Sequence, residues 1–153
     1  MPNHDPIEVR AVTTRRERAA FVDLPLALHR GSRGFVAPLR INELEMLDAK
    51  RNPFFAHGTL EPYLAYRGGR LVGRIAAIDT PRHNQIHEEN LAFFGFLEAT
   101  DASVTARLLE VVEGRARDWR RNAVRGPVNP SLNDSAGLQL DGYDDAPYIM
   151  MPW

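Results

Sequence analysis

Residues 126–137 gather the polar groups of this sequence that could bind or orient a ligand. The stretch GPVNPSLNDSAG contains two asparagines, two serines and an aspartate among two prolines and two glycines. Pro130 restricts Asn129 to extended conformations, which predicts a strand end followed by a sharp turn. Ser131 and Asp134 have the spacing of a helix-capping box. The turn would point backbone N–H groups and the side chains of Asn129, Ser131 and Asn133 at one place. A well-capped structural turn accounts for the same residues.

Two histidines offer a different chemistry. His83 and His87 lie four residues apart, with Glu88 and Glu89 beside them, and on a helix this spacing could hold a metal ion. Pro81 and the polar composition of the segment instead predict a loop, without a third convincing ligand. We therefore expect no metal. A histidine acting as a base at a pocket rim is an alternative to a solvated loop.

Composition limits the class of protein. The 153 residues predict one domain, 1–153, and 44% hydrophobic with 25% charged residues is typical of a globular chain. A net charge of −1 argues against a nucleic-acid partner. The sequence has no cysteine, which excludes disulfides, thiolate zinc sites and cysteine nucleophiles in this chain. We see no signal peptide or transmembrane segment, and we expect a cytoplasmic protein.

The first half of the sequence predicts a strand and two helices. Residues 7–12 alternate in polarity as a strand does. Thr14 and Glu17 form a capping box, so a helix should begin at Arg15. Pro25 should stop or kink it, and a further turn at 26–29 is the alternative. A second helix should run from Pro38 to about Lys50.

The second half predicts a hairpin, a long helix and further strands. Gly68-Gly69 should form the turn between strands at 63–67 and 71–78. Residues 91–97 are apolar on both faces, as in a central strand. The remaining expected elements are a helix at 102–121 capped by Asp101, strands at 124–128 and 148–151, and a short helix from Ser131. The arginines at 115, 117, 120 and 121 should form a solvated helix end.

This order of elements predicts an α/β or α+β fold with a mixed sheet. A long amphipathic helix between the fourth and fifth strands is a crossover, so those two strands should be parallel neighbours. The remaining neighbours should be mostly antiparallel, in a sheet of about six strands flanked by helices.

With this order the sequence resembles the GNAT acyltransferase fold and, more narrowly, a poorly characterised GNAT-like family of bacterial proteins. The resemblance covers essentially the whole chain. In that family the chain continues past Met-Met-Pro, so this sequence resembles the N-terminal part of such a protein, or an unusually short member. The segments that carry the resemblance are FVAPLR at 35–40, KRNPFFAH at 50–57, VGRIAA at 72–77 with His83-Asn84, and GPVNPSLN at 126–133 with Gly137-Leu138, Gly142-Tyr143 and Met150-Met151-Pro152.

The resemblance implies an acyl donor bound between the fourth and fifth strands. In GNAT proteins these strands splay, and the pantetheine arm of acyl-CoA bonds to the fourth strand, here Phe96, Leu97 and Glu98. Gly95 independently suggests a bulge or a close backbone approach, or merely relief of crowding. The other expected donor-binding residues are Ser103, Ser131 and Asn133. The cosubstrate would be an acyl-CoA or acyl-carrier-protein thioester.

The sequence departs from the GNAT pattern at the pyrophosphate loop. GNAT enzymes carry a glycine-rich turn with a cation before the long helix, whose N–H groups hold the phosphates. Here the turn reads Glu98-Ala99-Thr100-Asp101-Ala102-Ser103, without glycine or cation. Two carboxylates facing a pyrophosphate would weaken its binding by roughly a hundredfold. A carrier-bound or long-chain donor, or loss of donor binding, would fit this change.

Acyl transfer to an amine needs a base, an orienting group and a proton for the leaving thiolate. The candidates are Glu98 as base, Asn129 as the group that orients the substrate, and Tyr143 as proton donor. A solvated carboxylate at Glu98 and a core position for Tyr143 are the alternatives.

Two functions compete on these residues. The first is an N-acyltransferase-like protein that transfers an acyl group from a CoA or carrier-protein thioester to an amine. The second is a non-catalytic GNAT-like half-domain that supports a following domain or a dimer partner. A metal-dependent hydrolase would rest on His83 and His87 alone.

Overall fold

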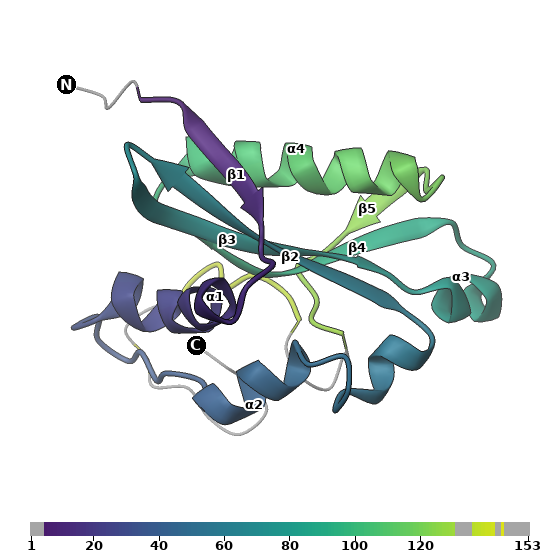
Figure 1. Cartoon of the computed structure of the whole chain (residues 1–153), viewed down its shortest axis with the longest axis horizontal. Coiled ribbons are helices and arrows are strands. Elements are labelled where there is room, and N and C mark those ends of the chain that lie inside the picture. Colours follow the sequence, from purple (N-terminus) through teal and green to yellow (C-terminus); the bar gives the residue numbers. More distant parts are fainter. Residues whose placement is uncertain (1–4, 131–135, 143–144, 146–153) are drawn as a thin grey trace.

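The computed structural model describes residues 5–130, 136–142 and 145, which form a mixed five-stranded sheet with helices on both faces (Figure 1). The strands are β1 (Ile7–Ala11), β2 (Thr59–Arg67), β3 (Arg70–Asp79), β4 (Leu91–Ala99) and β5 (Ala123–Arg125). They lie in chain order, antiparallel except for the parallel pair β4–β5. The predicted fold class and parallel pair are therefore confirmed. The sixth strand and the helix expected from Ser131 lie outside the described residues.

Three helices and two hydrophobic cores make the layers. Helices α1 (Arg15–His29) and α2 (Arg40–Met46) cover one face of the sheet, and α4 (Ala102–Asp118) covers the other (Figure 1). The first core includes Phe21, Leu64 and Phe96, and the second includes the α4 residues Val104 and Leu108. A short 3-10 helix, η1 (Pro53–Ala56), follows α2 and contributes Phe54 to the first core. No helix within the described ranges is long and apolar enough to cross a bilayer.

The hairpin between β2 and β3 forms where the glycines predicted it. Gly68 and Gly69 have φ angles of +54° and +75°. Residues with a Cβ rarely adopt this left-handed backbone conformation at two consecutive positions, so two glycines favour the tight turn. The turn thereby sets the register of the longest strand pair in the sheet.

Helix α1 begins as predicted but does not end at its proline. The Thr14 side chain accepts a hydrogen bond from the Glu17 N–H, and the Glu17 carboxylate accepts 2.8 Å bonds from the Thr13 and Thr14 N–H groups. Pro25 was expected to stop or kink the helix, with a further turn at 26–29 as the alternative, and the helix does continue to His29. Proline cannot donate to the carbonyl four residues earlier, here that of Phe21. In the structure Arg74 Nη1 donates to this carbonyl at 2.8 Å, so a side chain replaces the missing backbone donor.

Two other local predictions need correction. The second helix spans Arg40–Met46 rather than running from Pro38 to Lys50. Residues 81–87, expected as a loop, form helix α3 (Pro81–His87), because proline suits the first turn and the Thr80 hydroxyl accepts a bond from His83 N–H. Of these two helices, only α3 has a side-chain cap, whereas α2 begins at Leu39 without one, and the bounds of such short helices are easily misjudged from sequence.

The arginines at the end of α4 are not uniformly solvated, contrary to the prediction. Arg115 forms two bonds to the Glu61 carboxylate of β2, at 2.6 and 2.9 Å. Arg121 forms two bonds to Asp79 of β3, at 2.8 and 3.0 Å. These bidentate pairs attach the end of α4 to the sheet.

Candidate functional site

Glu98 and His29 meet at the face of the sheet that α1 covers. Glu98 lies near the end of β4, and one of its carboxylate oxygens is 2.7 Å from His29 Nε2 in the last turn of α1. Both side chains are about three-quarters buried, with 23% and 27% exposure. A carboxylate that bonds a histidine and still reaches solvent can orient the imidazole and accept a proton. The pair joins residues 69 positions apart.

Sequence reasoning identified Glu98 as the candidate base and missed His29. A signal for His29 was present, because it follows the buried residues Val22 and Pro25 at spacings of seven and four on the inner face of α1. A histidine at such a position points toward the sheet. Its partner depends on where β4 passes beneath the helix, which the spacing does not specify.

Arg74 places a buried cation next to this pair. It is directly opposite Glu98 in the β3–β4 register, and only 4% of it is exposed. Its guanidinium carbon lies 5.0 and 5.6 Å from the ring centroids of Phe21 and Phe96, and Nη1 lies 3.5 Å from the Glu43 carboxylate. Burial lowers the pKa of Arg74, while the charges of Glu43 and Glu98 raise it. Arginine stays protonated in proteins, so a positive charge is buried beside the Glu98–His29 pair.

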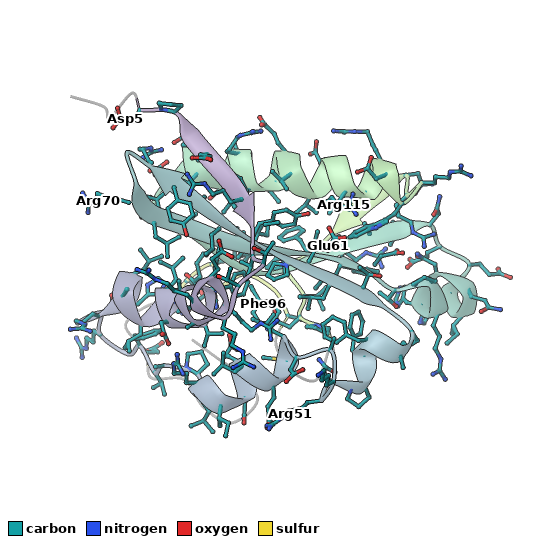
Figure 2. The ribbon with its side chains drawn as sticks, in the orientation of Figure 1. Asp5, Arg51, Glu61, Arg70, Phe96 and Arg115 are labelled. Atoms are coloured by element: carbon teal, nitrogen blue, oxygen red, sulfur yellow. The ribbon has the colours of Figure 1, made fainter. Side chains whose placement is uncertain are left out.

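A bulge in β4 shapes the edge that faces β5. The register advances by two residues on β3 and by three on β4 between the pairs Arg74–Glu98 and Ala76–Gly95. Phe96 in this bulge has a φ of +55°, which is rare for a bulky side chain and costs backbone strain. The ring of Phe96 is held by burial in the first core, against Phe21 at 5.6 Å between centroids. Figure 2 shows Phe96 between the sheet and the helices below it.

The opening between β4 and β5 is occupied by the chain itself. Regular pairing ends at Phe93 and Arg125, so the strands part there. Beyond that point Val128 N–H donates to Phe94 O at 2.7 Å, and the Asn129 side-chain oxygen accepts from Phe96 N–H at 3.1 Å. A Cβ on Gly95 would lie 2.4 Å from the Val128 carbonyl oxygen, which explains the glycine. Asn129, expected to orient a substrate, and Phe96, expected to bind pantetheine, are bonded to each other here.

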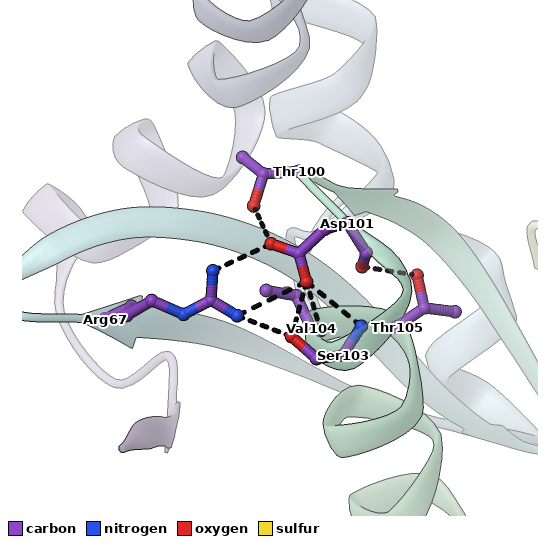
Figure 3. A network of polar contacts seen from close by, with 6 residues as sticks. All are labelled: Arg67, Thr100, Asp101, Ser103, Val104 and Thr105. Atoms are coloured by element: carbon purple, nitrogen blue, oxygen red, sulfur yellow. Dashed lines mark hydrogen bonds and ion pairs between the residues drawn. The ribbon is translucent and has the colours of Figure 1, made fainter. Parts of the chain in front are cut away.

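The start of α4 differs from the predicted arrangement of two repelling carboxylates. Asp101 accepts bonds from the N–H groups of Ser103 and Val104 at 3.0 and 3.1 Å, so it occupies the helix N-terminus. Arg67, from the end of β2, donates to Asp101 at 2.7 Å and to the Ser103 hydroxyl at 2.6 Å (Figure 3). The turn's own sequence contains no cation, and β2 supplies one. The hydrogen bond from Arg67 holds the pKa of Asp101 well below its usual range.

Glu98 does not share the place of Asp101. Its side chain bonds His29 on the α1 face, whereas Asp101 caps the helix on the opposite face. Repulsion by both carboxylates together is therefore not what disfavours a phosphate at the α4 N-terminus. The N–H groups of Ser103 and Val104 are already satisfied by the chain's own carboxylate.

The other predicted site residues separate into two groups. Leu97 lies on β4 beside Glu98, and Ser103 lies in the Asp101–Arg67 network. Ser131, Asn133 and Tyr143 are outside the described residues.

The histidines of α3 form a separate cluster. His83 Nε2 lies 2.9 Å from Glu89, and the His83 and His87 rings stack with centroids 4.4 Å apart. Glu89 also receives two bonds from Arg125 at 2.9 and 3.1 Å. Within the described part of the chain, no group of three or more His, Cys, Asp or Glu side chains is arranged to hold a metal ion.

The element order, the parallel β4–β5 pair and the β4 bulge define a GNAT-like fold. Comparison with solved structures supports this class. A tandem GNAT protein from the clavulanic acid biosynthesis pathway superimposes with a TM-score of 0.59 at 16% identity, over 76% of this chain and 34% of that chain. A ribosomal-protein-alanine N-acetyltransferase from Brucella melitensis biovar Abortus 2308 gives a TM-score of 0.53 at 14% identity, over 78% and 77%.

Two curated proteins are similar in sequence. The chain is 35% identical over 150 residues to a bacterial ceramide synthase from Caulobacter vibrioides (strain NA1000 / CB15N), covering 95% of this chain and 38% of that protein. It is 30% identical over 145 residues to protein YghO from Escherichia coli (strain K12), covering 94% and 37%. The chain therefore spans less than two-fifths of the length of either relative. No protein-family model matches it.

Proposed function

We propose that this chain is an N-acyltransferase-like domain that takes part in transferring an acyl group from a CoA or carrier-protein thioester to an amine. The observation that carries the proposal is the 2.7 Å contact between Glu98 and His29 beside the buried Arg74, on a GNAT-like fold. The similarity to a protein named a ceramide synthase supports a particular acceptor class. Ceramides are amides of long-chain amino alcohols, so we propose a long-chain amine as the acceptor.

The proposed reaction is a direct transfer. The acceptor ammonium gives a proton to the Glu98–His29 pair, its nitrogen attacks the thioester carbonyl, and the carbon–sulfur bond breaks. As that bond breaks the nitrogen loses a second proton and the thiolate takes up one, for which Tyr143 remains our candidate donor, regaining its proton from the nitrogen. Because the chain has no cysteine, it forms no acyl-cysteine intermediate of its own. We propose no metal in the reaction.

The donor would lie along β4 beyond the Asn129 contact, near Leu97 and Glu98. Ser103, Ser131 and Asn133 stay as proposed donor-binding residues, and Asn129 would orient substrate only by releasing Phe96 N–H. We further propose that residues 1–153 act as one domain in the cytoplasm. Their partner would be a second copy or a further half.

The test of this proposal measures the thiol that the donor releases, which is possible because this chain has no cysteine. Free thiol released from long-chain acyl-CoA or acyl-carrier protein can be measured without background from this chain, and the amide product can be identified by mass spectrometry. We expect Glu98→Gln to lower kcat by roughly a hundredfold or more, as is typical for loss of a general base. Glu113→Gln, on the exposed side of α4, is the matched control and should leave kcat unchanged. Equal rates for Glu98→Gln and the unmodified chain would remove the proposal.

A second candidate is a non-catalytic half-domain that supports a neighbouring domain or dimer partner. The observation in its favour is that Asp101 satisfies the α4 N-terminus and Asn129 occupies the β4 edge. Both places would otherwise suit an acyl-CoA. Calorimetric titration of the 153-residue chain with acyl-CoA and acyl-carrier protein separates the two candidates. Binding accompanied by turnover would exclude the non-catalytic role.

A further inference from the structure

Four large apolar side chains project into solvent within sixteen consecutive residues. Leu26 is 47% exposed, Val36 63%, Leu39 69% and Ile41 62%. Single exposed apolar residues are common on protein surfaces and need no explanation. Three other large hydrophobic side chains are exposed in the described part of the chain, namely Ile86, Leu138 and Leu140. More than half of the exposed large hydrophobic side chains in the described part of the chain thus lie between residues 26 and 41.

These residues come from the end of α1, the start of α2 and the loop between them, and one ion pair brings the two helices together here. On α1, Leu26 is three residues after Asp23, so both lie on the same face of the helix. Arg40 donates to the Asp23 carboxylate at 2.6 and 3.1 Å, which brings its neighbours Leu39 and Ile41 next to that face. The loop between the helices folds back too, because the Phe35 ring lies 5.2 Å from that of His29.

The same surface is positively charged. No Asp or Glu occurs from Leu24 to Asn42, although the whole chain has a net charge of −1. Arg30 and Arg33 are exposed, and neither has an ion-pair partner among the residues that the structure describes. The nearest acids along the chain already have partners: Asp23 pairs with Arg40, the buried Glu43 lies by Arg74, and Glu45 and Asp48 pair with Arg51. We call Leu26, Arg30, Arg33, Val36, Leu39 and Ile41 the 26–41 surface.

We propose that the 26–41 surface docks the protein on an anionic lipid bilayer. Val36, Leu39 and Ile41 would enter the headgroup region, and Arg30 and Arg33 would pair with lipid phosphates. The mixture of aliphatic side chains and exposed arginines fits this partner. His29 directly precedes Arg30, so the bilayer would lie near the last turn of α1, whose inner face carries the Glu98–His29 pair, and an amphiphilic acceptor could reach the pair from there.

Charge disfavours a second copy as the occupant. A two-fold dimer through this surface would place Arg30 and Arg33 of one copy against the same arginines of the other, without an acid between 24 and 42 to neutralise them. A protein partner usually meets aromatic anchors at the centre of an interface, and the exposed large side chains here are aliphatic. A bilayer requires neither self-complementarity nor such anchors.

The test is flotation of the 153-residue chain with vesicles. We expect binding to phosphatidylcholine vesicles that contain about 30 mol% phosphatidylglycerol, and weak binding to pure phosphatidylcholine. Binding should fall as NaCl rises from about 0.05 to about 0.5 M, because salt screens the arginines. Arg30→Gln with Arg33→Gln should weaken binding about 25-fold, at about fivefold per arginine. Leu39→Ser with Ile41→Ser should weaken it at least about tenfold.

Matched controls make the result specific. Arg70→Gln with Arg82→Gln removes two exposed arginines elsewhere, and Leu138→Ser with Leu140→Ser removes two exposed leucines. Both controls should bind vesicles as the unmodified chain does, and circular dichroism should show that every variant is folded. Vesicle binding that is absent, or that the controls reduce as much as the test variants, would overturn the proposal. A dimer dissociated by Leu39→Ser with Ile41→Ser, without vesicle binding, would also overturn it.

Discussion

At the scale of single residues, the carbonyl oxygen of Phe21 connects a proline in α1 with the cation of the candidate site. Pro25 has no N–H for this carbonyl, and Arg74 reaches across from β3 to donate at 2.8 Å. A buried carbonyl without a donor would cost about 1–3 kcal/mol. Pro25, a residue type that usually ends helices, thus leaves a free carbonyl that helps to hold the buried Arg74 next to Glu98.

Arg74→Met should lower the free energy of unfolding by about 2–4 kcal/mol, because Phe21 loses its donor and Glu43 loses a nearby cation. In a Pro25→Ala background the helix N–H can satisfy the Phe21 carbonyl. The cost of Arg74→Met should then be smaller by about 1 kcal/mol. Urea denaturation of the four chains in this cycle measures the coupling. Strictly additive costs would contradict the link between Pro25 and Arg74.

Gly95 allows residues 128 and 129 to lie against β4. We expect Gly95→Ala to lower the free energy of unfolding by about 1–3 kcal/mol, because the new Cβ meets backbone atoms of Val128 that cannot move independently. Gly114→Ala in α4 is the control, since a Cβ there has no atom within 4 Å. It should raise stability by up to about 1 kcal/mol, as alanine favours helices. Denaturant midpoints compare the two, and equal effects would refute the close contact.

At the scale of elements, the starts of α1 and α4 are both closed by carboxylates of the chain itself. Glu17 bonds the N–H groups of Thr13 and Thr14, and Asp101 bonds those of Ser103 and Val104. Each carboxylate must be ionised to accept these bonds fully, and each has a lowered pKa in the folded protein. Both helix starts should therefore weaken in acid.

The hydrogen bond from the Thr13 backbone, with those from Thr14, lowers the pKa of Glu17 from 4.5 to about 2. A lowered folded-state pKa contributes stability above the unfolded value, and this is lost as pH falls through the folded value. The Tm difference between the unmodified chain and Glu17→Gln should thus be constant above about pH 5 and vanish near about pH 2. Glu113→Gln serves as the control, and a Tm difference that does not change with pH would count against the capping box.

At the scale of the whole molecule, the sheet separates two environments. The α1–α2 face carries the Glu98–His29 pair and the 26–41 surface, and the α4 face carries the Arg67–Asp101 network. Figure 1 shows these helices on opposite sides of the sheet. A donor that reaches Glu98 therefore gains nothing from the α4 N-terminus while Asp101 remains bonded there.

This arrangement leads to an expectation about donors. If the chain binds an acyl thioester, S-acyl-pantetheine should bind within about threefold of the corresponding acyl-CoA, because the α4 N–H groups are not available for the pyrophosphate. Isothermal titration calorimetry with both ligands measures the ratio. A preference for acyl-CoA above about tenfold would mean that the Asp101 network opens for the donor.

Local features of the sequence were sufficient for most elements and for the fold class. The Gly68-Gly69 turn, the Thr14–Glu17 capping box and the apolar stripe of α4 each depend on residues close together in the chain, so local stereochemistry specifies them. The same reasoning identified Glu98 as a candidate base. It failed at α3, where a short polar segment with a good start resembles a loop.

The amino-acid sequence alone determined the alternation of strands and helices, the crossover that makes β4 and β5 parallel, and the absence of cysteine chemistry in this chain. Only the tertiary structure decided which charges meet: His29 with Glu98, Arg67 with Asp101, and Arg74 with the Phe21 carbonyl. Backbone preferences act over a few residues, whereas these contacts join positions 34 to 69 apart. Such contacts exist only after the sheet has fixed its register and the helices have packed on its two faces.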